Sequence, residues 1–508
     1  MARAGMSKAR RALCVASLLL LAGCRIGPRY HEPKGPTPNA STYKETHEAT
    51  HEATDAHGTW KVASPSDAML RGKWWQVFRE PELDGLEDRL NFDNNNIKQA
   101  FELYIAARAQ IRQAEAGYWP TVTAAPGVTM SHTSGTFGVG SVTAGSNGGN
   151  GFRVTQFTAP AQASWAPDLF GRVQNTVKQF QYGAQISAAD LESQRLVEQA
   201  TLAQTFFQIR GQDTLQEVLD ATVDTNEKVL RLNQSLYETG IGTEVAVVQA
   251  EQTLEASRVA AINVRIARAQ LEHAIATLLG VPAADFSIPK RSLLGKPPPI
   301  PMGMPSQLLE RRPDIAAAER AMAQANAIIG IGYSAFFPAL TLTGSAGFSS
   351  SDLTKLFTWP SFVWSIGASI SQPLFDAGLR RATVDQYIAQ YNATVAGYRQ
   401  TVLTAFQQVE DFLATTAILS EEVDKQKEVV NLAERAFDLE RSRYETGIDP
   451  YLNLMTQQQI LLSSRQTLVN LQIQQMVSAV NLVQALGGGW DRSELPSTSE
   501  VSKRPEEH

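Results

Sequence analysis

Cysteine is almost absent from this chain, which has two cysteines among 508 residues, Cys14 and Cys24. If Cys14 is lost with a leader, no intramolecular disulfide is possible, and the fold cannot depend on one. Histidine is also scarce, and four of the seven histidines lie between residues 31 and 57. The sequence shows no spaced nucleophile and base, no phosphate-binding loop and no convincing cluster of metal ligands. We therefore predict no enzyme activity, no cofactor and no metal site.

Basic stripes and long apolar runs are missing as well. The first 23 residues carry four basic and no acidic side chains, so removing them changes the formal net charge from -6 to -10. No stripe of Lys and Arg is present, which argues against a nucleic-acid partner. The apolar run Leu13–Leu21 is too short for a stable transmembrane helix. This short run after a basic start is typical of a signal peptide.

The N-terminus predicts a lipid-anchored exported protein. Leu21-Ala22-Gly23-Cys24 resembles a bacterial lipobox, which predicts a signal peptide over 1–23 and lipidation of Cys24. Several acyl chains would anchor the chain firmly in outer-membrane lipid. The sequence looks like lipoproteins in which an Asp directly after the lipidated cysteine retains the protein at the inner membrane. In this chain Arg25 occupies that position. An ordinary secretory signal, cleaved nearby, is the alternative.

A literal zinc-protease pattern, H-E-x-x-H, occurs at His47–His51. Such a motif needs both histidines on one face of a buried helix, with the glutamate as base. Here the tetrapeptide His-Glu-Ala-Thr occurs twice in tandem, at 47–50 and 51–54, with no apolar face around it. We interpret the segment as a slipped repeat within an N-terminal tether and equatorial segment, 24–82. Whether this His-rich tether binds metal is left open.

The chain contains one stretch twice. YETGIGTEVAVVQAEQTLEASR at 237–258 matches YETGIDPYLNLMTQQQILLSSR at 444–465 without a gap. Such a repeat is the first feature to consider, because it determines the architecture of the chain. Because glycine breaks helices and permits positive φ, Gly240 and Gly447 predict turns between long helical runs.

The repetition extends to whole halves, so we expect one duplicated protomer. The first repeat covers 83–280, with a β-hairpin at 120–167 and a turn at 237–243; a linker or equatorial segment follows at 281–305. The second repeat covers 306–487, with a β-hairpin at 338–373 and a turn at 444–450. The polar C-terminal tail covers 488–508, and we expect its residues after Trp490 to be disordered. Long helices are predicted over 172–236, 243–279, 379–443 and 450–486, and a shorter helical run over 83–116.

The two β regions have the pattern of membrane strands. Phe362, Trp364, Ile366, Ala368 and Ile370 alternate with small residues. Alternating segments of about 10 residues, with aromatics at their ends, suit transmembrane β-strands. Soluble hairpins packed on the helices are the alternative. Four strands cannot close a barrel, and lipid does not tolerate open edges, so spanning hairpins require an oligomer of two, three or more chains.

Several motifs in a fixed order carry a family resemblance. They are the lipobox, Trp-Trp-x-x-Phe at 74–78, Arg-Arg-Pro-Asp-Ile at 311–315 followed by Phe336-Phe337-Pro338, and the paired Tyr-Glu-Thr-Gly turns. Together they resemble the outer membrane factors, the TolC-like efflux channels, and within them the lipoprotein branch that includes OprM and NodT. The resemblance covers nearly all of 20–490.

The resemblance implies a mainly α fold with a β-barrel part. Three copies would form a 12-stranded transmembrane barrel continuous with a 12-helix periplasmic α-barrel. The homotrimer would sit in the cell outer membrane and extend into the periplasm. It would dock to a membrane fusion protein, the adaptor, and to an inner-membrane pump of the RND type. It would act as a passive exit channel of a tripartite efflux system, as in multidrug resistance.

The same resemblance assigns roles to the turns. The adaptor-contacting tips would comprise Tyr237, Thr239, Gly240, Ile241, Tyr444, Thr446, Gly447 and Ile448. The aperture candidates are Leu452, Asn453, Met455 and Thr456. Many relatives carry an aspartate where Thr456 stands, so a neutral constriction is expected here. A non-conducting structural or receptor lipoprotein is the alternative function. The exported substrate, the identities of pump and adaptor, and the resting state of the gate are left open.

Overall fold

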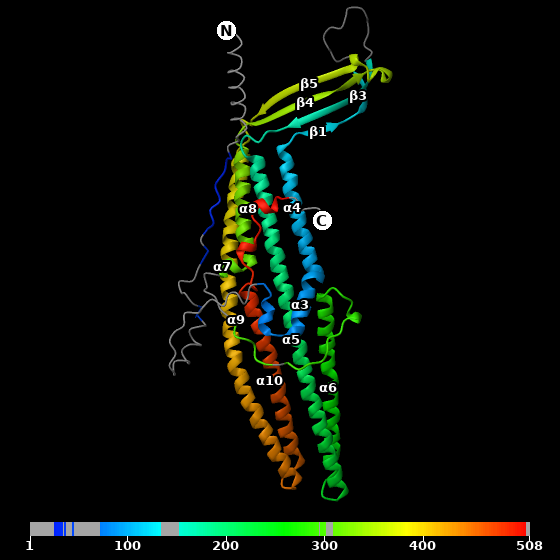
Figure 1. Ribbon diagram of the computed structural model, residues 1–508, viewed down its shortest axis with the longest axis vertical. Coiled ribbons are helices and arrows are strands. Elements are labelled where there is room, and N and C mark those ends of the chain that lie inside the picture. Colours follow the sequence, from blue (N-terminus) through cyan, green and yellow to red (C-terminus); the bar gives the residue numbers. More distant parts are fainter. Residues whose placement is uncertain are drawn as a thin grey trace, which may run out of the picture.

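The computed structural model describes residues 25–33, 35–36, 43–44, 72–133, 152–293, 295–300 and 308–503. Long helices run side by side along the molecule, and one β-sheet lies beyond one end of them (Figure 1). Two helical hairpins extend away from the sheet and end in tight turns (Figure 1). Cys24 and the His47–His51 pattern lie outside the described residues, so their predicted roles stay predictions.

The two hairpins have the same dimensions. In the first half, α5 (Arg172–Glu238) has 67 residues and α6 (Glu244–Leu278) has 35. In the second half, α9 (Leu379–Glu445) again has 67 residues and α10 (Tyr451–Ala485) again has 35. This match confirms the internal duplication. No helix in the described part of the chain combines the length and the apolar character that crossing a membrane requires.

Shorter helices pack beside the long helices (Figure 1). They are α3 (Pro81–Asp93), α4 (Asn95–Glu115), α7 (Leu308–Arg311) and α8 (Pro313–Ser334). The helical run predicted over 83–116 is present, but Asn94 divides it into α3 and α4. The Asn94 side chain accepts hydrogen bonds from the backbone N–H groups of Asn96 and Ile97, at 2.8 and 3.0 Å. Asparagine is a strong N-cap, and here it starts a new helix.

The sheet is antiparallel and has four strand positions. Its strands are β1 (Thr121–Ala124), β2 (Gly127–Thr133), β3 (Phe152–Trp165), β4 (Ala339–Ser350) and β5 (Phe362–Ser371). The order is β1-β3-β4-β5, and β2 also pairs with β3, so β1 and β2 share one position. The single first strand that we predicted is interrupted at Pro126, which has no N–H to give to a ladder.

A belt of apolar and ionic contacts, formed by residues 74–93 and 279–293, lies around the middle of the helices. The 3-10 helix η2 (Trp74–Phe78) buries both tryptophans and Phe78 against α3 and α5. Trp74 donates a hydrogen bond to the Gln199 side chain at 3.0 Å. This aromatic anchor fixes the N-terminal end of the belt on the first hairpin.

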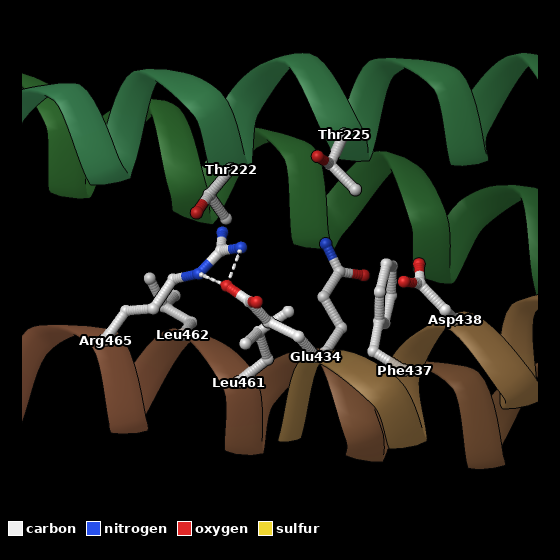
Figure 2. Close-up of a pocket in the computed structure, with 9 residues that line it drawn as sticks. Thr222, Thr225, Glu434, Phe437, Asp438, Leu461, Leu462 and Arg465 are labelled. Carbon is white, nitrogen blue, oxygen red and sulfur yellow. Dashed lines mark hydrogen bonds and ion pairs between the residues drawn. The ribbon is translucent and has the colours of Figure 1, made fainter. Parts of the chain in front are cut away.

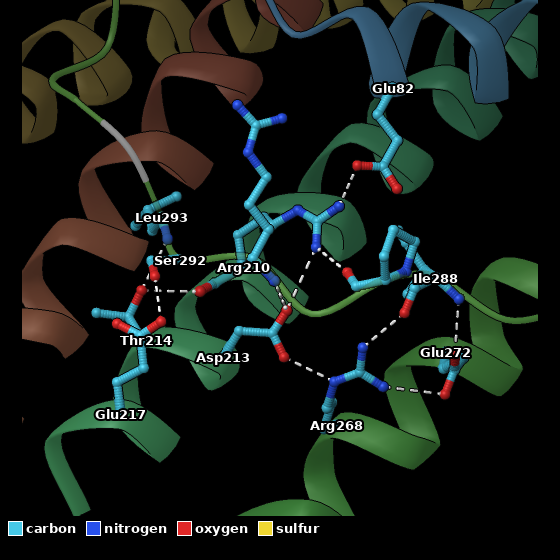
Figure 3. A network of polar contacts seen from close by, with 12 residues as sticks. Glu82, Arg210, Asp213, Thr214, Glu217, Arg268, Glu272, Ile288, Ser292 and Leu293 are labelled. Atoms are coloured by element: carbon cyan, nitrogen blue, oxygen red, sulfur yellow. Dashed lines mark hydrogen bonds and ion pairs between the residues drawn. The ribbon is translucent and has the colours of Figure 1, made fainter. Parts of the chain in front are cut away.

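A buried ionic network fixes the segment after α6 (Figure 3). This segment begins with the 3-10 helix η4 (Ala283–Asp285). Arg210 of α5 pairs with Glu82 and donates to the Pro289 carbonyl at 2.6 Å. Arg268 of α6 pairs with Asp213 at 2.6 Å and donates to the Ile288 carbonyl at 2.8 Å. Charges removed from water need such partners, so this network holds α3, α5, α6 and the belt segment together.

The C-terminal segment is ordered as far as residue 503, contrary to our expectation for the residues after Trp490. It contains the 3-10 helix η8 (Arg492–Glu494) and α11 (Thr498–Val501). Trp490 and Val501 are buried in separate clusters against the helices. Arg492 pairs with Glu32 at 2.9 Å and with the buried Glu319 at 3.5 Å. Two apolar anchors and one ionic clamp offset the loss of chain entropy in an otherwise polar segment. Three further 3-10 helices are η3 (Ala116–Tyr118), η6 (Leu353–Lys355) and η7 (Trp359–Ser361).

One buried carboxylate in the belt has no compensating partner. Glu87 of α3 is fully buried, and within the described residues neither of its carboxylate oxygens accepts a hydrogen bond. Burial, followed by the nearby Asp84 and Asp88, raises the pKa of Glu87 well above its usual value. The folded protein therefore holds a proton there that the unfolded chain releases at lower pH.

Glu87→Gln is expected to stabilise the protein at neutral pH. Because the folded-state pKa of Glu87 is raised, stability is full below the unfolded pKa and falls as pH rises toward the folded pKa. The glutamine variant should not lose this stability. Its free energy of unfolding should exceed that of the natural protein by up to about 1.4 kcal/mol for each pH unit above the unfolded-state pKa. Thermal unfolding followed by circular dichroism should show the advantage at pH 7 and its disappearance near about pH 4. Glu102→Gln, on the exposed surface of α4, is the control. An advantage that does not change with pH would contradict this account.

Candidate functional site

The two hairpin tips have nearly identical backbones. Gly240 and Gly447 have φ of 76° and 74°, a region that L side chains rarely adopt. Thr239 and Thr446 each donate a hydrogen bond to a carbonyl four residues earlier, at 3.0 Å in both cases. Ile241 and Ile448 are 75% and 65% exposed. Both tips therefore present a small apolar projection on a tight turn.

The two tyrosines of the Tyr-Glu-Thr-Gly turns lie in different environments. Tyr237 is 49% exposed, whereas Tyr444 is 8% exposed. The Tyr444 hydroxyl donates to the Asn233 side chain of α5 at 2.5 Å. Burial raises the pKa of Tyr444, so the phenol stays neutral and remains a donor. The repeat predicts equal turns and does not reveal this difference.

Three side-chain contacts join the second hairpin to the first near the tips. Besides Tyr444 to Asn233, the Gln458 amide of α10 donates to the Asn226 side chain of α5. Thr253 of α6 donates to the Met455 sulfur at 3.5 Å. We call these three pairs the latch. An apolar cluster surrounds them and includes Val229, Ala250, Phe437, Tyr451 and Leu454.

Sequence reasoning missed the first-hairpin side of the latch. Asn226 and Asn233 are seven residues apart on α5, and both are buried. A buried asparagine at one heptad position is a known way to fix pairing between helices, at some cost in stability. The seven-residue spacing of two asparagines within an apolar stripe was the signal that could have identified them.

The aperture candidates lie on the first two turns of α10. Leu452 is 60% exposed, Asn453 and Thr456 are exposed, and Met455 is half-buried. The Thr456 hydroxyl donates to the Leu452 carbonyl at 2.8 Å. This bond within the helix leaves the Thr456 side chain uncharged and held against its own backbone.

A groove of about 740 Å³ begins beside these residues, between α5, α6 and α10. None of its lining residues is charged. They are Thr222, Asn226, Gln249, Gln252, Thr253, Ala256, Ser257, Ala260, Met455, Thr456, Gln458, Gln459, Ile460, Leu462 and Gln466. We call it the neutral groove.

A smaller hollow of about 200 Å³ also borders Gln458 but carries charge (Figure 2). Glu434 and Arg465 form an ion pair there at 2.6 Å, and Asp438 lies close by. The Gln458 amide oxygen is buried and accepts no hydrogen bond within the described residues. The tip region therefore separates an uncharged groove from a charged hollow.

The second tip is stiffened by an ion pair that the first tip does not repeat at the matching positions. Arg443 pairs with Asp449, and hydrogen bonds from Arg443 are the main reason that the pKa of Asp449 lies below its usual value. Pro450 precedes α10, whereas Gly242 and Thr243 precede α6. In the described part of the chain no group of three or more His, Cys, Asp or Glu residues is placed to hold a metal ion.

Comparison with known proteins agrees with this geometry. The family model "Outer membrane efflux protein" matches residues 93–281 and 304–488. The chain is 32% identical over 496 residues to the solvent efflux pump outer membrane protein SrpC of Pseudomonas putida, covering 95% of this chain and 99% of SrpC. It is 28% identical to the cation efflux system protein CusC of Escherichia coli, covering 94% and 98%.

A solved structure shows the same fold. The open state of the MtrE outer membrane channel of Neisseria gonorrhoeae is 26% identical, with a TM-score of 0.74, and the match covers 92% of this chain and 99% of MtrE. The family model spans well over half of the chain and includes both hairpins. The chain therefore belongs to the outer membrane efflux protein family and is an exit channel of the outer membrane.

Proposed function

We propose that three copies of this chain form one passive conduit, which is closed at the latch until a partner opens it. The observation that carries this proposal is a four-position sheet with two unpaired edges at one end of the molecule and two latched hairpins at the other. An adaptor would contact the tips, and an inner-membrane pump, of the RND type by the family resemblance, would supply the energy.

The sheet supports assembly of several copies. One edge is β5 and the other is shared by β1 and β2. Unpaired backbone groups cost several kcal/mol each in lipid, so these edges must pair with neighbouring copies. Three copies would supply twelve strand positions and leave no edge.

Two helices also present apolar seams that no other described residue of the protomer covers. Val245, Val248, Val259, Ile262 and Ile266 of α6 are at least 56% exposed and follow three- and four-residue spacing. Ile418, Val429, Leu432 and Leu439 of α9 are at least 45% exposed with the same spacing. Such spacing is typical of helices that pack together. We infer that α6 of one copy packs on α9 of the next.

Charges placed in this seam should prevent assembly. Ile262→Glu combined with Leu432→Glu would bury a carboxylate on each side of every interface, at about 3 kcal/mol or more per interface. Light scattering or native mass spectrometry of the purified protein should show a trimer for the natural chain and smaller species for the variant. Asn263→Glu, one position away on an exposed face of α6, is the control. Intact trimers in the double variant would rule out this seam.

The latch provides a gate. Opening the tip requires α9 and α10 to move away from α5 and α6, which breaks the three latch pairs. A partner that binds the separated hairpins better than the latched ones shifts the population toward the open state. The buried network around Arg210 and Arg268 holds α5 and α6 to the belt, so we assign the movement to α9 and α10.

Tyr444→Phe should favour the open channel. The variant removes the hydroxyl that bonds Asn233 and leaves the ring in place. Loss of one such bond is worth about 1 kcal/mol, or about fivefold in the closed-to-open ratio for each copy. Single-channel recording in a planar bilayer should show more frequent openings. Tyr237→Phe, the matching half-exposed residue of the first tip, is the control. Equal behaviour of both variants would remove Tyr444 from the gate.

The same recordings separate the two candidate functions. Correctly assembled natural protein that never conducts, together with a silent Tyr444→Phe variant, would support a structural or receptor lipoprotein instead of a channel. Openings in either protein would support the channel. The family match supports the function as an exit channel, whereas the latch contacts support the proposed gate.

The N-terminal strap, residues 25–33, supports a lipid anchor at Cys24. Arg25 donates to the Asn175 side chain at 2.7 Å, and Asn175 donates to the Ile26 carbonyl at 3.0 Å. A Cβ atom on Gly171 would lie 2.9 Å from the Arg25 Cα. Gly171 directly precedes α5, close to the end of β3. Arg25 therefore lies beside the start of α5, at the helical edge of the sheet.

Cys24→Ala should remove the lipid. Mass spectrometry of the natural mature protein should find an acylated N-terminal cysteine, and the variant should lack every acyl group. Cys14→Ala, which alters only the predicted leader, is the control and should keep the lipid. An unmodified Cys24 in the natural protein would favour the ordinary secretory signal.

A further inference from the structure

The strand register divides the sheet into two chemically distinct faces. Residues paired across antiparallel strands point to the same side. One face carries large apolar side chains and includes Trp165, Leu340, Leu342, Phe348, Trp364, Ile366 and Ile370. Trp364, Ile366 and Ile370 are at least 67% exposed. Lipid is the solvent that such a face suits.

The opposite face therefore lines the interior of the barrel, and in the described strands it bears no charged residue. Its members are mainly hydroxyl and amide side chains: Thr121, Thr123, Thr129, Ser131, Gln156, Thr158, Gln162, Ser164, Thr341, Thr343, Ser345, Ser349, Ser365, Ser369 and Ser371. Over residues 121–131, 154–164, 339–349 and 363–371, glycine, alanine, valine and Pro160 fill the remaining positions of this face. Arg153 is the charged residue in these strands, and its register places it on the other face, near the outer end of β3.

Side chains on the inner face bond to one another. Ser345 and Ser365 share a hydrogen bond at 2.8 Å, and Gln156 donates to the Ser349 hydroxyl at 2.9 Å. Such pairs satisfy polar groups without adding net charge. The inner wall is therefore polar and uncharged over the described strands.

The tip region, at the opposite end of the long helices from the sheet, repeats this chemistry. The neutral groove at the aperture is lined by amides, hydroxyls and apolar groups, whereas charged side chains are found in the hollow beside it (Figure 2). Gln458, which lines this groove, contributes a buried amide oxygen that has no hydrogen-bond partner among the described residues. Two separate parts of the path thus avoid fixed charge, although the mature chain carries a formal charge of -10 after loss of the predicted leader.

We propose that the conduit discriminates only weakly by charge, because its barrel wall and its aperture are both uncharged, and that it suits uncharged amphipathic organic molecules as well as ions of either sign. A ring of like charges would attract counter-ions and repel co-ions. Amides and hydroxyls give hydrogen bonds to polar groups of any solute without holding a counter-ion. The inference rests on the proposed channel and concerns the residues that determine its specificity.

The test measures the reversal potential of open channels in a planar bilayer under a roughly tenfold KCl gradient. The natural protein, or Tyr444→Phe if openings are rare, should reverse near zero, with potassium and chloride permeabilities within about twofold of each other. Strong preference for one ion would overturn the proposal while leaving the channel intact. Silence of every protein would instead count against the channel itself, so the two failures differ.

Matched variants at Gln162 test the barrel wall. Gln162 pairs with Ser345 and Thr123 on the inner face. Gln162→Glu should shift the reversal potential toward that of potassium, and Gln162→Lys should shift it toward that of chloride, because each trimer gains three charges of one sign. Gln162→Asn should change nothing. Shifts in the same direction, or none, would place Gln162 away from the path.

Thr456→Asp tests the aperture in the same experiment. Its three added carboxylates should shift selectivity toward potassium, and lowering the salt should enlarge the shift because screening falls. Thr225→Asp, in the charged hollow, is the control and should have a smaller effect. Equal shifts from both variants would overturn the assignment of the neutral groove to the path.

Discussion

The unpaired edges of the sheet are the constraint on which the rest of the structure depends. Within the part of the chain that the structure describes, four strand positions leave two rows of backbone N–H and C=O groups without partners, at β5 and at β1 with β2. Within lipid these groups have no water to bond, so one copy is incomplete by itself. Closing the sheet through neighbours also brings the long helices of those neighbours together. In our proposal, closing the sheet in this way also packs the exposed seam on α6 of one copy against the seam on α9 of the next. The space inside the closed sheet and the space between the helices then form one continuous path.

The contacts of the belt indicate which helices of that assembly are held in place. Arg210, Asp213 and Arg268 form a buried ionic network that joins both helices of the first hairpin to the backbone at Ile288 and Pro289. The second hairpin is joined to the first near its tip by three side-chain bonds and one apolar cluster. A buried ion pair is costly to break, whereas a neutral hydrogen bond is worth about 1 kcal/mol. This difference in strength supports the proposal that the first hairpin stays in place while the second moves at its tip.

Local patterns were enough to predict most of the fold. Apolar spacing gave the long helices, alternation gave the strands of the second β region, and the Tyr-Glu-Thr-Gly repeat gave the two turns. The failures involve tertiary contacts. The break at Asn94 depends on a cap within an otherwise helical run. The order of residues 490–503 depends on pockets for Trp490 and Val501 that distant helices provide. The exposed positions of Asn453 and Thr456 follow from α10, but their role at an aperture, like lipidation of Cys24, stays a prediction.

The two tips differ in backbone freedom, and this difference has a consequence for how a partner is recognised. The second tip holds Pro450 and the Arg443–Asp449 ion pair, so few backbone conformations are open to it. The first tip has glycine at 240 and 242 and lacks the proline, so its unbound ensemble is broader. A partner that docks on both tips therefore loses more conformational entropy at the first than at the second. The pre-ordered second tip would be engaged first, and the first tip would then fold around whatever surface remains.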